Sequence, residues 1–271
     1  IILHTNLGRS PLSERARQGV NRVMEGYCAL EYDLECGARS NRQIHIAGRI
    51  AAATGAEDAL AVNNNAAAIL LVLAGLTRGR EVIVSRGELV EIGGSFRIPE
   101  VLEQSGAIMV EVGTTNKTRL ADYANAITPN TAAILKVHTS NFRIVGFTEE
   151  SDPADMCGLA HQQGILAIND LGSGTLYSLA KGAFREPSIA ESVRAGFDVV
   201  TFSGDKLLGA GQAGIIAGRR RVLDTLRKNP LMRACRIDKM SLAALEGTLI
   251  DYAAGRHEES VPVWAMMTAS P

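Results

Sequence analysis

The sequence predicts an α/β protein built on a mainly parallel β-sheet. Short apolar runs rich in β-branched residues recur along the chain without clean alternation with polar residues, which is typical of strands buried on both faces. Segments with helical spacing separate these runs at intervals of roughly 15–35 residues. Strands that alternate with helices in this way are joined by right-handed crossovers into a parallel sheet.

The individual elements follow from these two patterns. We expect Ile1–Leu3 to be a strand already in progress. Buried strands are predicted at Val82–Val84, Ala107–Val112, Ala132–Val137, Ile165–Asn169, Val199–Phe202 and Gly214–Ala217. Helices are predicted at Ala66–Leu73, Leu89–Gln104, Arg219–Lys228 and Lys239–Ala253.

The two ends suggest the core of a longer protein. Residues 1–228 hold every predicted strand and form one large domain, whereas residues 229–271 form a linker and a long helix that leads away from it. The first residues begin inside a strand, and Val261–Pro271 ends without a helix cap. We therefore expect truncated terminal domains at both ends.

Composition limits the classes of function. With 271 residues, 46% of them hydrophobic and 21% charged, the chain is globular rather than disordered. A formal net charge of -1 excludes a strongly basic protein that coats nucleic acid, although not a local basic patch. No apolar stretch reaches the roughly 18 residues of a membrane span. The four cysteines are too scattered for a disulfide framework or a zinc site, so we expect a soluble cytoplasmic protein without a metal.

Polar residues collect at the carboxyl ends of the predicted strands, where ligands bind in sheets of this kind. Ser85–Glu88, His138–Asn141, Asp170–Gly174 and Ser203–Lys206 each follow a strand, and Asn63–Asn65 opens a helix. Because the carboxyl ends of parallel strands meet at one edge of a sheet, five such turns predict a site there.

Lys206 is the first candidate for chemistry at this edge. It follows a buried strand and lies among glycines that let a ligand approach the backbone. A lysine in such a place loses its proton through desolvation and attacks an aldehyde to form a Schiff base. Most lysines are simply exposed on the surface, but the strand-end position and the glycines favour the nucleophile.

Asp170 ends an earlier buried strand and needs a cationic or hydrogen-bonded partner. A protonated pyridine nitrogen would be such a partner and would keep the ring an electron sink. The alternative is an N-cap for the segment that follows. The Asn63–Asn65 run and the free N–H groups of its helix suit a phosphate, to which Ser203 can add a hydroxyl. Together these features predict a pyridoxal-phosphate site of the aspartate-aminotransferase-like class.

Longer motifs resemble one family within that class. The strings HTNLGRSPLS, EIGGSFRIP, KVHTSNFRI, INDLGSGTL, TFSGDKLLGAGQAGIIAG and RIDKMSLAALEGTL resemble bacterial selenocysteine synthase, the L-seryl-tRNA(Sec) selenium transferase family. The resemblance runs from Ile1 to about Ala253. It implies a fold-type I large domain with a seven-stranded sheet between helices, and pyridoxal 5'-phosphate as cofactor.

The resemblance also implies roles for matching residues. Lys206 would be the Schiff-base lysine, Asp170 would face the pyridine nitrogen, and Asn141 would lie near the 3-hydroxyl of the cofactor. Asn64, Asn65 and Ser203 would contact its phosphate. Asp205 matches a family acid of the same site. The family arginines of the aminoacyl or selenophosphate site match Arg9, Arg42, Arg233 and Arg236.

Several neighbouring residues keep two interpretations. Guanidinium groups bind phosphate oxygens in bidentate fashion, so clustered arginines suit selenophosphate, but Arg233 and Arg236 also fit a solvated loop. His138 could stack on the ring or shuttle protons, or be an ordinary histidine satisfied by its neighbours. Glu88 and Glu91 could contact the ring or act as acid or base. The cysteines Cys28, Cys36, Cys157 and Cys235 are interpreted as small apolar residues.

The reaction implied by the resemblance converts L-seryl-tRNA(Sec) to L-selenocysteinyl-tRNA(Sec). Water is eliminated from the β-carbon to give an aminoacrylyl intermediate, and selenium from selenophosphate adds to it. The leaving hydroxyl needs an acid, for which Asp205, Glu88 or a bound water are candidates. Family members bind tRNA mainly through domains missing from this chain. They form rings of dimers, and a decamer is one such ring. Arg9 or Arg42 could therefore contact the cofactor of a neighbouring subunit.

Two other functions fit part of the sequence. A pyridoxal-dependent lyase of the same superfamily, such as an ammonia lyase acting on a small amino acid or an amino-sugar acid phosphate, would share the DLGSG and SGDK segments without using tRNA. A non-catalytic assembly or tRNA-scaffold fragment would bind no cofactor. An absorbance band that borohydride bleaches separates the second alternative from both enzymes.

Overall fold

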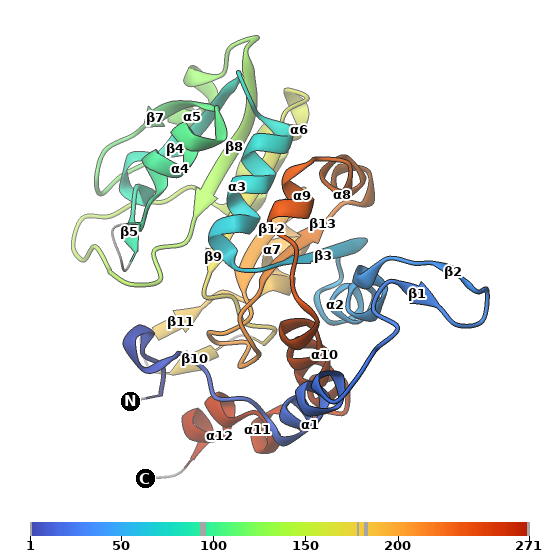
Figure 1. The fold of residues 1–271 in the computed structure, drawn as a ribbon. Helices are drawn as coiled ribbons and strands as arrows, with labels where there is room; N and C mark the ends of the chain where they lie inside the picture. The colour runs from blue at the N-terminus through green and yellow to red at the C-terminus, as the bar shows by residue number, and fades with distance from the viewer. Residues whose placement is uncertain (1, 93–95, 178, 182–183, 270–271) are drawn as a thin grey trace.

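A seven-stranded sheet forms the centre of the computed structural model, which describes residues 2–92, 96–177, 179–181 and 184–269 (Figure 1). Its strand order is β3-β13-β12-β9-β8-β4-β7. The strands span Asp58–Val62 (β3), Glu81–Ser85 (β4), Ile108–Val112 (β7), Thr131–Val137 (β8), Leu166–Gly172 (β9), Val199–Ser203 (β12) and Gly214–Gly218 (β13). All pairs are parallel except the two made by β13. The predicted fold class is confirmed.

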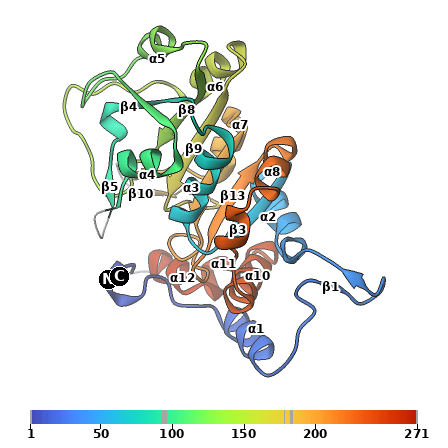
Figure 2. The same cartoon turned by 45° about the horizontal axis from the view of Figure 1, so that its top comes forward.

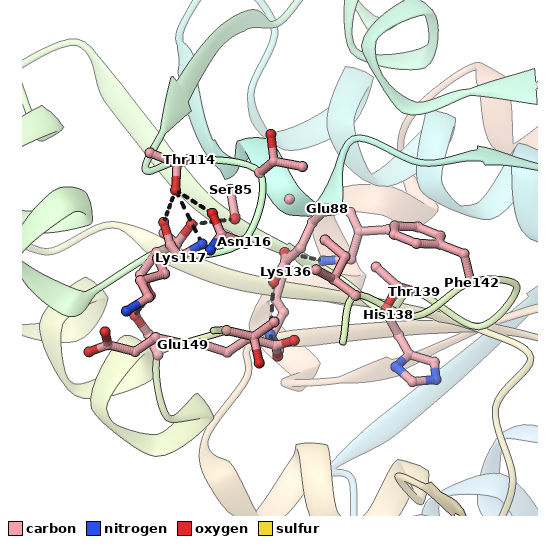
Figure 3. Close-up of a pocket in the computed structure, with 18 of the residues that line it drawn as sticks. Ser85, Glu88, Thr114, Asn116, Lys117, Lys136, His138, Thr139, Phe142 and Glu149 are labelled. Carbon is pink, nitrogen blue, oxygen red and sulfur yellow. Dashed lines mark hydrogen bonds and ion pairs between the residues drawn. The ribbon is translucent and has the colours of Figure 1, made fainter. Parts of the chain in front are cut away.

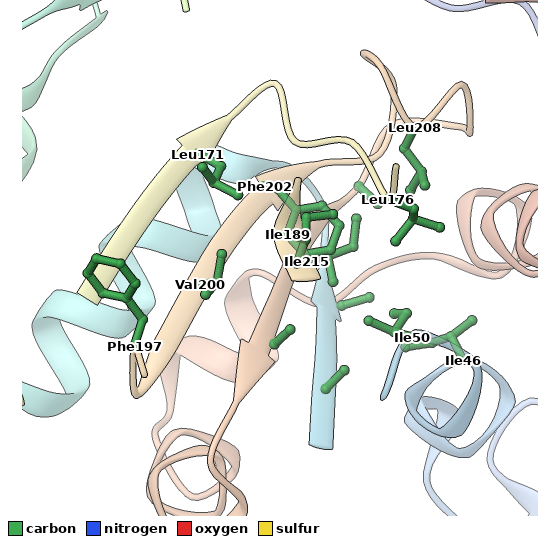
Figure 4. Packing of buried hydrophobic residues seen from close by; sticks show 14 of the residues in the cluster. Ile46, Ile50, Leu171, Leu176, Ile189, Phe197, Val200, Phe202, Leu208 and Ile215 are labelled. Atoms are coloured by element: carbon green, nitrogen blue, oxygen red, sulfur yellow. The ribbon is translucent and has the colours of Figure 1, made fainter. Parts of the chain in front are cut away.

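Helices cover both faces of the sheet (Figure 2). One face packs against α3 (Asn65–Leu76), α4 (Ile98–Ser105) and α8 (Arg220–Arg227), and the other against α2 (Ala47–Thr54), α5 (Leu120–Ala126), α6 (Pro153–Gln162) and α7 (Ile189–Ala195). Strand residues alternate between the two cores: in β3, Leu60 faces the first and Ala61 the second. Figure 4 shows part of the second core, where Ile46 and Ile50 lie near Ile215.

The remaining elements lie around this three-layer body. α1 (Glu14–Met24) packs on the long α10 (Lys239–Ala253), and the short α11 (His257–Ser260) and α12 (Pro262–Thr268) follow it. A hairpin of β1 (Tyr32–Asp33) and β2 (Ala38–Arg39) projects from the body (Figure 1). The smaller elements are β5 (Glu91–Ile92), β6 (Phe96–Arg97), β10 (Leu179–Lys181), β11 (Phe184–Glu186), α9 (Leu231–Ala234) and 3-10 turns at Thr5–Leu7, Arg42–His45 and Arg86–Glu88. No described helix has the length and apolar character needed to span a bilayer.

Most predicted elements are confirmed with shifts of one to a few residues, and α10 has the predicted bounds. The edge strand β3 was missed, because its DALAV sequence is rich in alanine rather than in β-branched residues. The single helix predicted at Leu89–Gln104 is wrong. Its first part forms β5 and β6, and α4 begins at Ile98 with Pro99 in its first turn, a position where proline starts a helix. Residues 93–95 lie outside the described ones.

The ends also differ from expectation. Ile2 and Leu3 form no strand, because His4 caps the 3-10 turn that follows, and Ile1 is outside the described residues. The segment Val261–Pro271 was expected to end without a helix cap, but α12 occupies most of it. Like α4, this helix has a proline in its first turn, Pro262. Residues 270–271 are not described.

Candidate active site

The predicted polar turns do meet at one edge of the sheet. β3, β12, β9, β8 and β4 all run in the same direction, so the turns after them lie side by side. Asp170 lies near the carboxyl end of β9, and Lys206 lies on the turn after the adjacent strand β12. Their charges interact, as expected of side chains that face the same space.

Asp170 is almost fully buried, with three donors around one of its oxygens. Asn65 Nδ2 lies 2.8 Å, Thr201 Oγ1 2.9 Å and the Gly172 backbone nitrogen 3.1 Å from Oδ1. Among the described residues no donor bonds to Oδ2. Burial raises the pKa of Asp170, and these hydrogen bonds and the charge of Lys206 oppose that rise. The carboxylate therefore has one oxygen available for a cationic partner.

Lys206 is the partly buried amine of the site. Burial lowers its pKa, and so does the positive charge of Arg9, while Asp170, Asp205 and Glu186 act in the opposite direction. Among the described residues, no hydrogen bond or ion pair engages its Nζ. A lysine with a lowered pKa and no fixed partner suits attack on a carbonyl carbon.

Arg9 and Asp205 form an ion pair beside this lysine. Arg9 Nη1 lies 3.0 Å from Asp205 Oδ2, and the Ser10 backbone N–H donates to the Asp205 carbonyl at 3.2 Å. Arg9 has φ 64°, the one positive value at a non-glycine position in the part of the chain that the structure describes. Left-handed backbone of this kind costs about 1 kcal/mol or more and clusters at functional sites.

The asparagines lie at the start of α3. Asn64 is its N-cap, with Oδ1 accepting from the Ala67 backbone N–H at 2.9 Å, whereas the Asn65 amide is turned toward Asp170. Asn65 Oδ1 is buried and has no hydrogen-bond partner among the described residues. Gly214 lies so close to the backbone at the start of α3 that a Cβ on it would be 2.0 Å from the Asn64 carbonyl oxygen. Ser203 is buried at the end of β12.

Glu186 was missed by the sequence analysis. It is buried next to His138, with Oε2 3.2 Å from His138 Nε2, and the Ser173 hydroxyl donates to Oε1. Burial alone would raise its pKa, but these hydrogen bonds and the charges of His138 and Lys206 hold the pKa below its usual value. The sequence offered no signal, since Glu186 ends a short hairpin rather than a strand of the main sheet.

Asn141 lies farther out, on an exposed turn after β8. Its Nδ2 donates to the Glu91 carbonyl at 2.9 Å, and it shares a cavity wall with His138 and Glu186. Its expected contact with a cofactor hydroxyl stays a prediction, as do the phosphate contacts of Asn64, Asn65 and Ser203.

The four predicted arginines do not form one cluster. Arg42, Arg233 and Arg236 line a shared cavity near β3 together with Glu31, whereas Arg9 is placed beside Asp205. Arg42 is buried and already bonded to Glu31 and to the Ile237 carbonyl. The topology of the chain separates Arg9 from the other arginines, because the segment 233–236 follows α8 and contacts β3 at Val62.

Another polar cavity, with His138 in its wall, lies between the ends of β4, β7 and β8 (Figure 3). Glu88 and Lys136 form a buried pair in its wall at 2.8 Å, and the Val137 backbone N–H donates to the other oxygen of Glu88. Burial raises the pKa of Glu88 in spite of Lys136. Glu91 instead pairs with Arg97 on the surface. Glu88 is therefore engaged within the protein rather than turned toward Lys206.

Comparisons with known proteins give a consistent result. A family model described as L-seryl-tRNA selenium transferase matches residues 1–271. The chain is 55% identical over 272 residues to the L-seryl-tRNA(Sec) selenium transferase of Geobacter sulfurreducens, covering 100% of this chain and 59% of that protein. The enzyme of the same name from Clostridium perfringens is 56% identical over 270 residues, covering 99% and 58%. The chain thus spans about three-fifths of the length of these curated relatives.

Solved structures show the same fold at low identity. D-glucosaminate-6-phosphate ammonia-lyase superposes with a TM-score of 0.74 at 22% identity, covering 94% of this chain and 66% of that one. A Thermus thermophilus aspartate aminotransferase double mutant gives 0.67 at 18% identity, covering 96% and 66%.

Proposed function

The chain belongs to the L-seryl-tRNA selenium transferase family, and from this premise we propose that it carries the catalytic site of an enzyme converting L-seryl-tRNA(Sec) to L-selenocysteinyl-tRNA(Sec). The cofactor would be pyridoxal 5'-phosphate and the selenium donor selenophosphate. The observation that carries the proposal is the Lys206 amine, which has a lowered pKa, bonds to none of the described residues and interacts with the charge of the buried Asp170.

The residues at the sheet edge fit this cofactor. Asp170 Oδ2 is available to a protonated ring nitrogen, and Lys206 is available to the aldehyde. The start of α3 offers backbone N–H groups to a phosphate. Gly214 packs against the backbone of Asn64 and Asn65 there and has no side chain that would block the approach. When bound, pyridoxal phosphate supplies a ring that takes up the electron pair released at the substrate α-carbon.

Lys206 would perform the proton transfer at the α-carbon. Its lowered pKa increases the fraction of neutral amine near neutral pH, and a neutral amine is what accepts a proton. Of the two acidic residues considered for the leaving β-hydroxyl, Asp205 is nearer to Lys206 than Glu88 is, although it is paired with Arg9. Asp205 lies next to Lys206 in the chain and interacts with its charge, whereas Glu88 is paired with Lys136 in a separate cavity.

The arginines support an anionic second substrate. Arg233 and Arg236 line a cavity with the more deeply buried Arg42, and guanidinium groups match phosphate oxygens. Within one chain, Arg9 lies apart from these three arginines. A single site that used all four arginines would therefore take residues from more than one subunit. We propose a cytoplasmic homo-oligomer built from dimers, in which tRNA is bound mainly through segments outside this sequence.

The cofactor assignment is tested on the chain itself. Addition of pyridoxal phosphate should give an absorbance band at roughly 410–430 nm that borohydride bleaches and fixes covalently to the protein. Lys206→Ala should abolish the reducible band, whereas Lys239→Ala, a lysine on α10, should leave it unchanged. A reducible band that persists in Lys206→Ala would refute the assignment.

The substrate assignment needs a separate assay. A chimera that joins this chain to the flanking segments of the Geobacter sulfurreducens relative should form selenocysteinyl-tRNA from seryl-tRNA(Sec) only when selenophosphate is present. Turnover of small amino acid phosphates, without turnover of seryl-tRNA(Sec), would instead favour a lyase.

A further inference from the structure

The turn that carries Lys206 is held from outside the sheet. We call residues 204–210 the lysine turn. Ser10, from the N-terminal segment of the chain, bonds to both ends of the turn. Its backbone N–H donates to the Asp205 carbonyl at 3.2 Å, and its hydroxyl donates to the Ala210 carbonyl at 2.8 Å. Within the turn, the Gly209 backbone N–H donates to the Lys206 carbonyl at 2.9 Å. None of these bonds reaches the carbonyls of Leu207 and Leu208, the two residues after the lysine.

Those two carbonyls accept hydrogen bonds from ring donors on the C-terminal helices. Trp264 Nε1 on α12 donates to the Leu207 carbonyl at 3.1 Å, and the Tyr252 hydroxyl on α10 donates to the Leu208 carbonyl at 3.0 Å. Each ring has only one N–H or O–H donor, and each directs it at this turn. Burial raises the pKa of Tyr252, so its hydroxyl keeps its proton and remains a donor.

The two donor rings cannot easily turn away. They belong to an aromatic cluster of Tyr177, Tyr252, His257 and Trp264. His257 stacks against both tyrosines, with ring centroids 4.5 Å from Tyr177 and 5.0 Å from Tyr252, and the tyrosine centroids are themselves 5.9 Å apart. Trp264 meets His257 edge-on at 5.1 Å. Tyr252 and Trp264 are each about 3% exposed.

The backbone of the lysine turn also fits the C-terminal segment closely. Gly209 has φ 73°, and a Cβ there would lie 2.3 Å from Val261 Cγ1, between α11 and α12. Leu208 points into the neighbouring core toward Leu176 (Figure 4). The turn is thus fitted against α10, α11 and α12, which lie below this edge of the sheet (Figure 1).

We infer that Tyr252 and Trp264 are positioning residues for Lys206, because their hydrogen bonds fix the backbone carbonyls of the two residues that follow it. The inference rests on the proposed function only in taking Lys206 as the reacting amine. A purely structural role would hold the C-terminal helices to the domain and leave the reactivity of Lys206 unchanged.

The test uses Tyr252→Phe, Trp264→Phe and the double variant, with Tyr177→Phe as a matched control. Tyr177 belongs to the same cluster, but its hydroxyl makes no hydrogen bond among the described residues. The reactivity of Lys206 is measured first without cofactor, by competitive labelling with acetic anhydride over a pH series and mass spectrometry of its peptide. Affinity for pyridoxal phosphate and the pH midpoint of the reducible band are measured next.

We expect each single variant to weaken cofactor binding about two- to tenfold, because one hydrogen bond is lost. The double variant should also move the labelling profile of Lys206 to higher pH, since a looser turn exposes the amine. Tyr177→Phe should match the parent in both. Unchanged labelling and affinity in the double variant, with only a lower Tm, would overturn the inference. Absence of a band in the parent would refute the cofactor assignment alone, because labelling does not need the cofactor.

Discussion

The side-chain amide of Asn65 lies 2.8 Å from Oδ1 of Asp170, and so joins the start of α3 to the end of β9. The two residues are 105 positions apart in the chain. This bond, with those from Thr201 and Gly172, fixes the orientation of the carboxylate. It also gives Asn65 a definite partner, whereas the neighbouring Asn64 is used to cap the helix.

Asn65→Ala should weaken cofactor binding by about tenfold or more. The variant removes one of three donors to Asp170, and a hydrogen bond to a charged group contributes about 1.5–3 kcal/mol. The pKa of Asp170, already raised by burial, should rise further, which favours the uncharged acid and disfavours a cationic partner. Titration with pyridoxal phosphate, followed at the absorbance band, measures the effect.

Two further variants decide what such a result means. Thr201→Val removes another donor to the same oxygen and should act in the same direction. Thr77→Val removes a buried hydroxyl that donates to the Leu73 carbonyl at the C-terminal end of α3, so it should lower stability without changing cofactor affinity. Equal affinities in the parent and in Asn65→Ala would contradict the assigned role.

Local patterns were enough to predict six of the seven sheet strands and the edge at which their polar turns meet. The buried strands and α10 follow from apolar runs and helical spacing, and the turn at Lys206 follows from its strand and glycines. Local patterns failed where long-range contacts decide the structure. β3 is a strand because it pairs with β13, and the ion pair of Arg9 joins positions 196 apart in the chain. No local signal marks Glu186 or the separation of Arg9 from Arg233.

Arg9→Ala and Asp205→Asn should shift the pKa of Lys206 in opposite directions. The positive charge of Arg9 lowers that pKa, so its removal should raise it and move the half-maximal labelling of Lys206 to higher pH. The negative charge of Asp205 raises it, so its removal should move labelling to lower pH. Competitive labelling of the purified chain measures both. Shifts of the same sign would show that the ion pair acts on Lys206 by packing rather than by charge.

Asp251→Ala should lower the free energy of unfolding by about 1.5–3 kcal/mol, because the hydrogen bonds that the buried carboxylate accepts are lost. Asp251 is buried on α10 and accepts from the Ser13 hydroxyl at 2.8 Å and from Arg15 Nε at 2.9 Å, so it ties α1 to α10. Denaturant titration gives the difference. Glu14→Ala, which breaks an exposed pair on α1, should cost less than about 1 kcal/mol. Similar costs for both variants would show that the Asp251 network does not hold the two helices together.

His257 should make the protein less stable as the pH falls through the ordinary range of histidine. Its ring stacks against both Tyr177 and Tyr252, and its Nδ1 is buried without a hydrogen-bond partner among the described residues. Burial lowers its pKa in spite of the nearby Glu258. The unfolded chain then binds a proton near pH 6.5 that the folded chain does not bind. Stability is therefore fully present above that pH and decreases below it. His257→Phe keeps a stacked ring but cannot titrate, so its free energy of unfolding should depend less on pH between about 5 and 7. His45→Phe, outside the aromatic cluster, should keep the slope of the parent. A parent-like slope in His257→Phe would show that other groups cause the pH dependence.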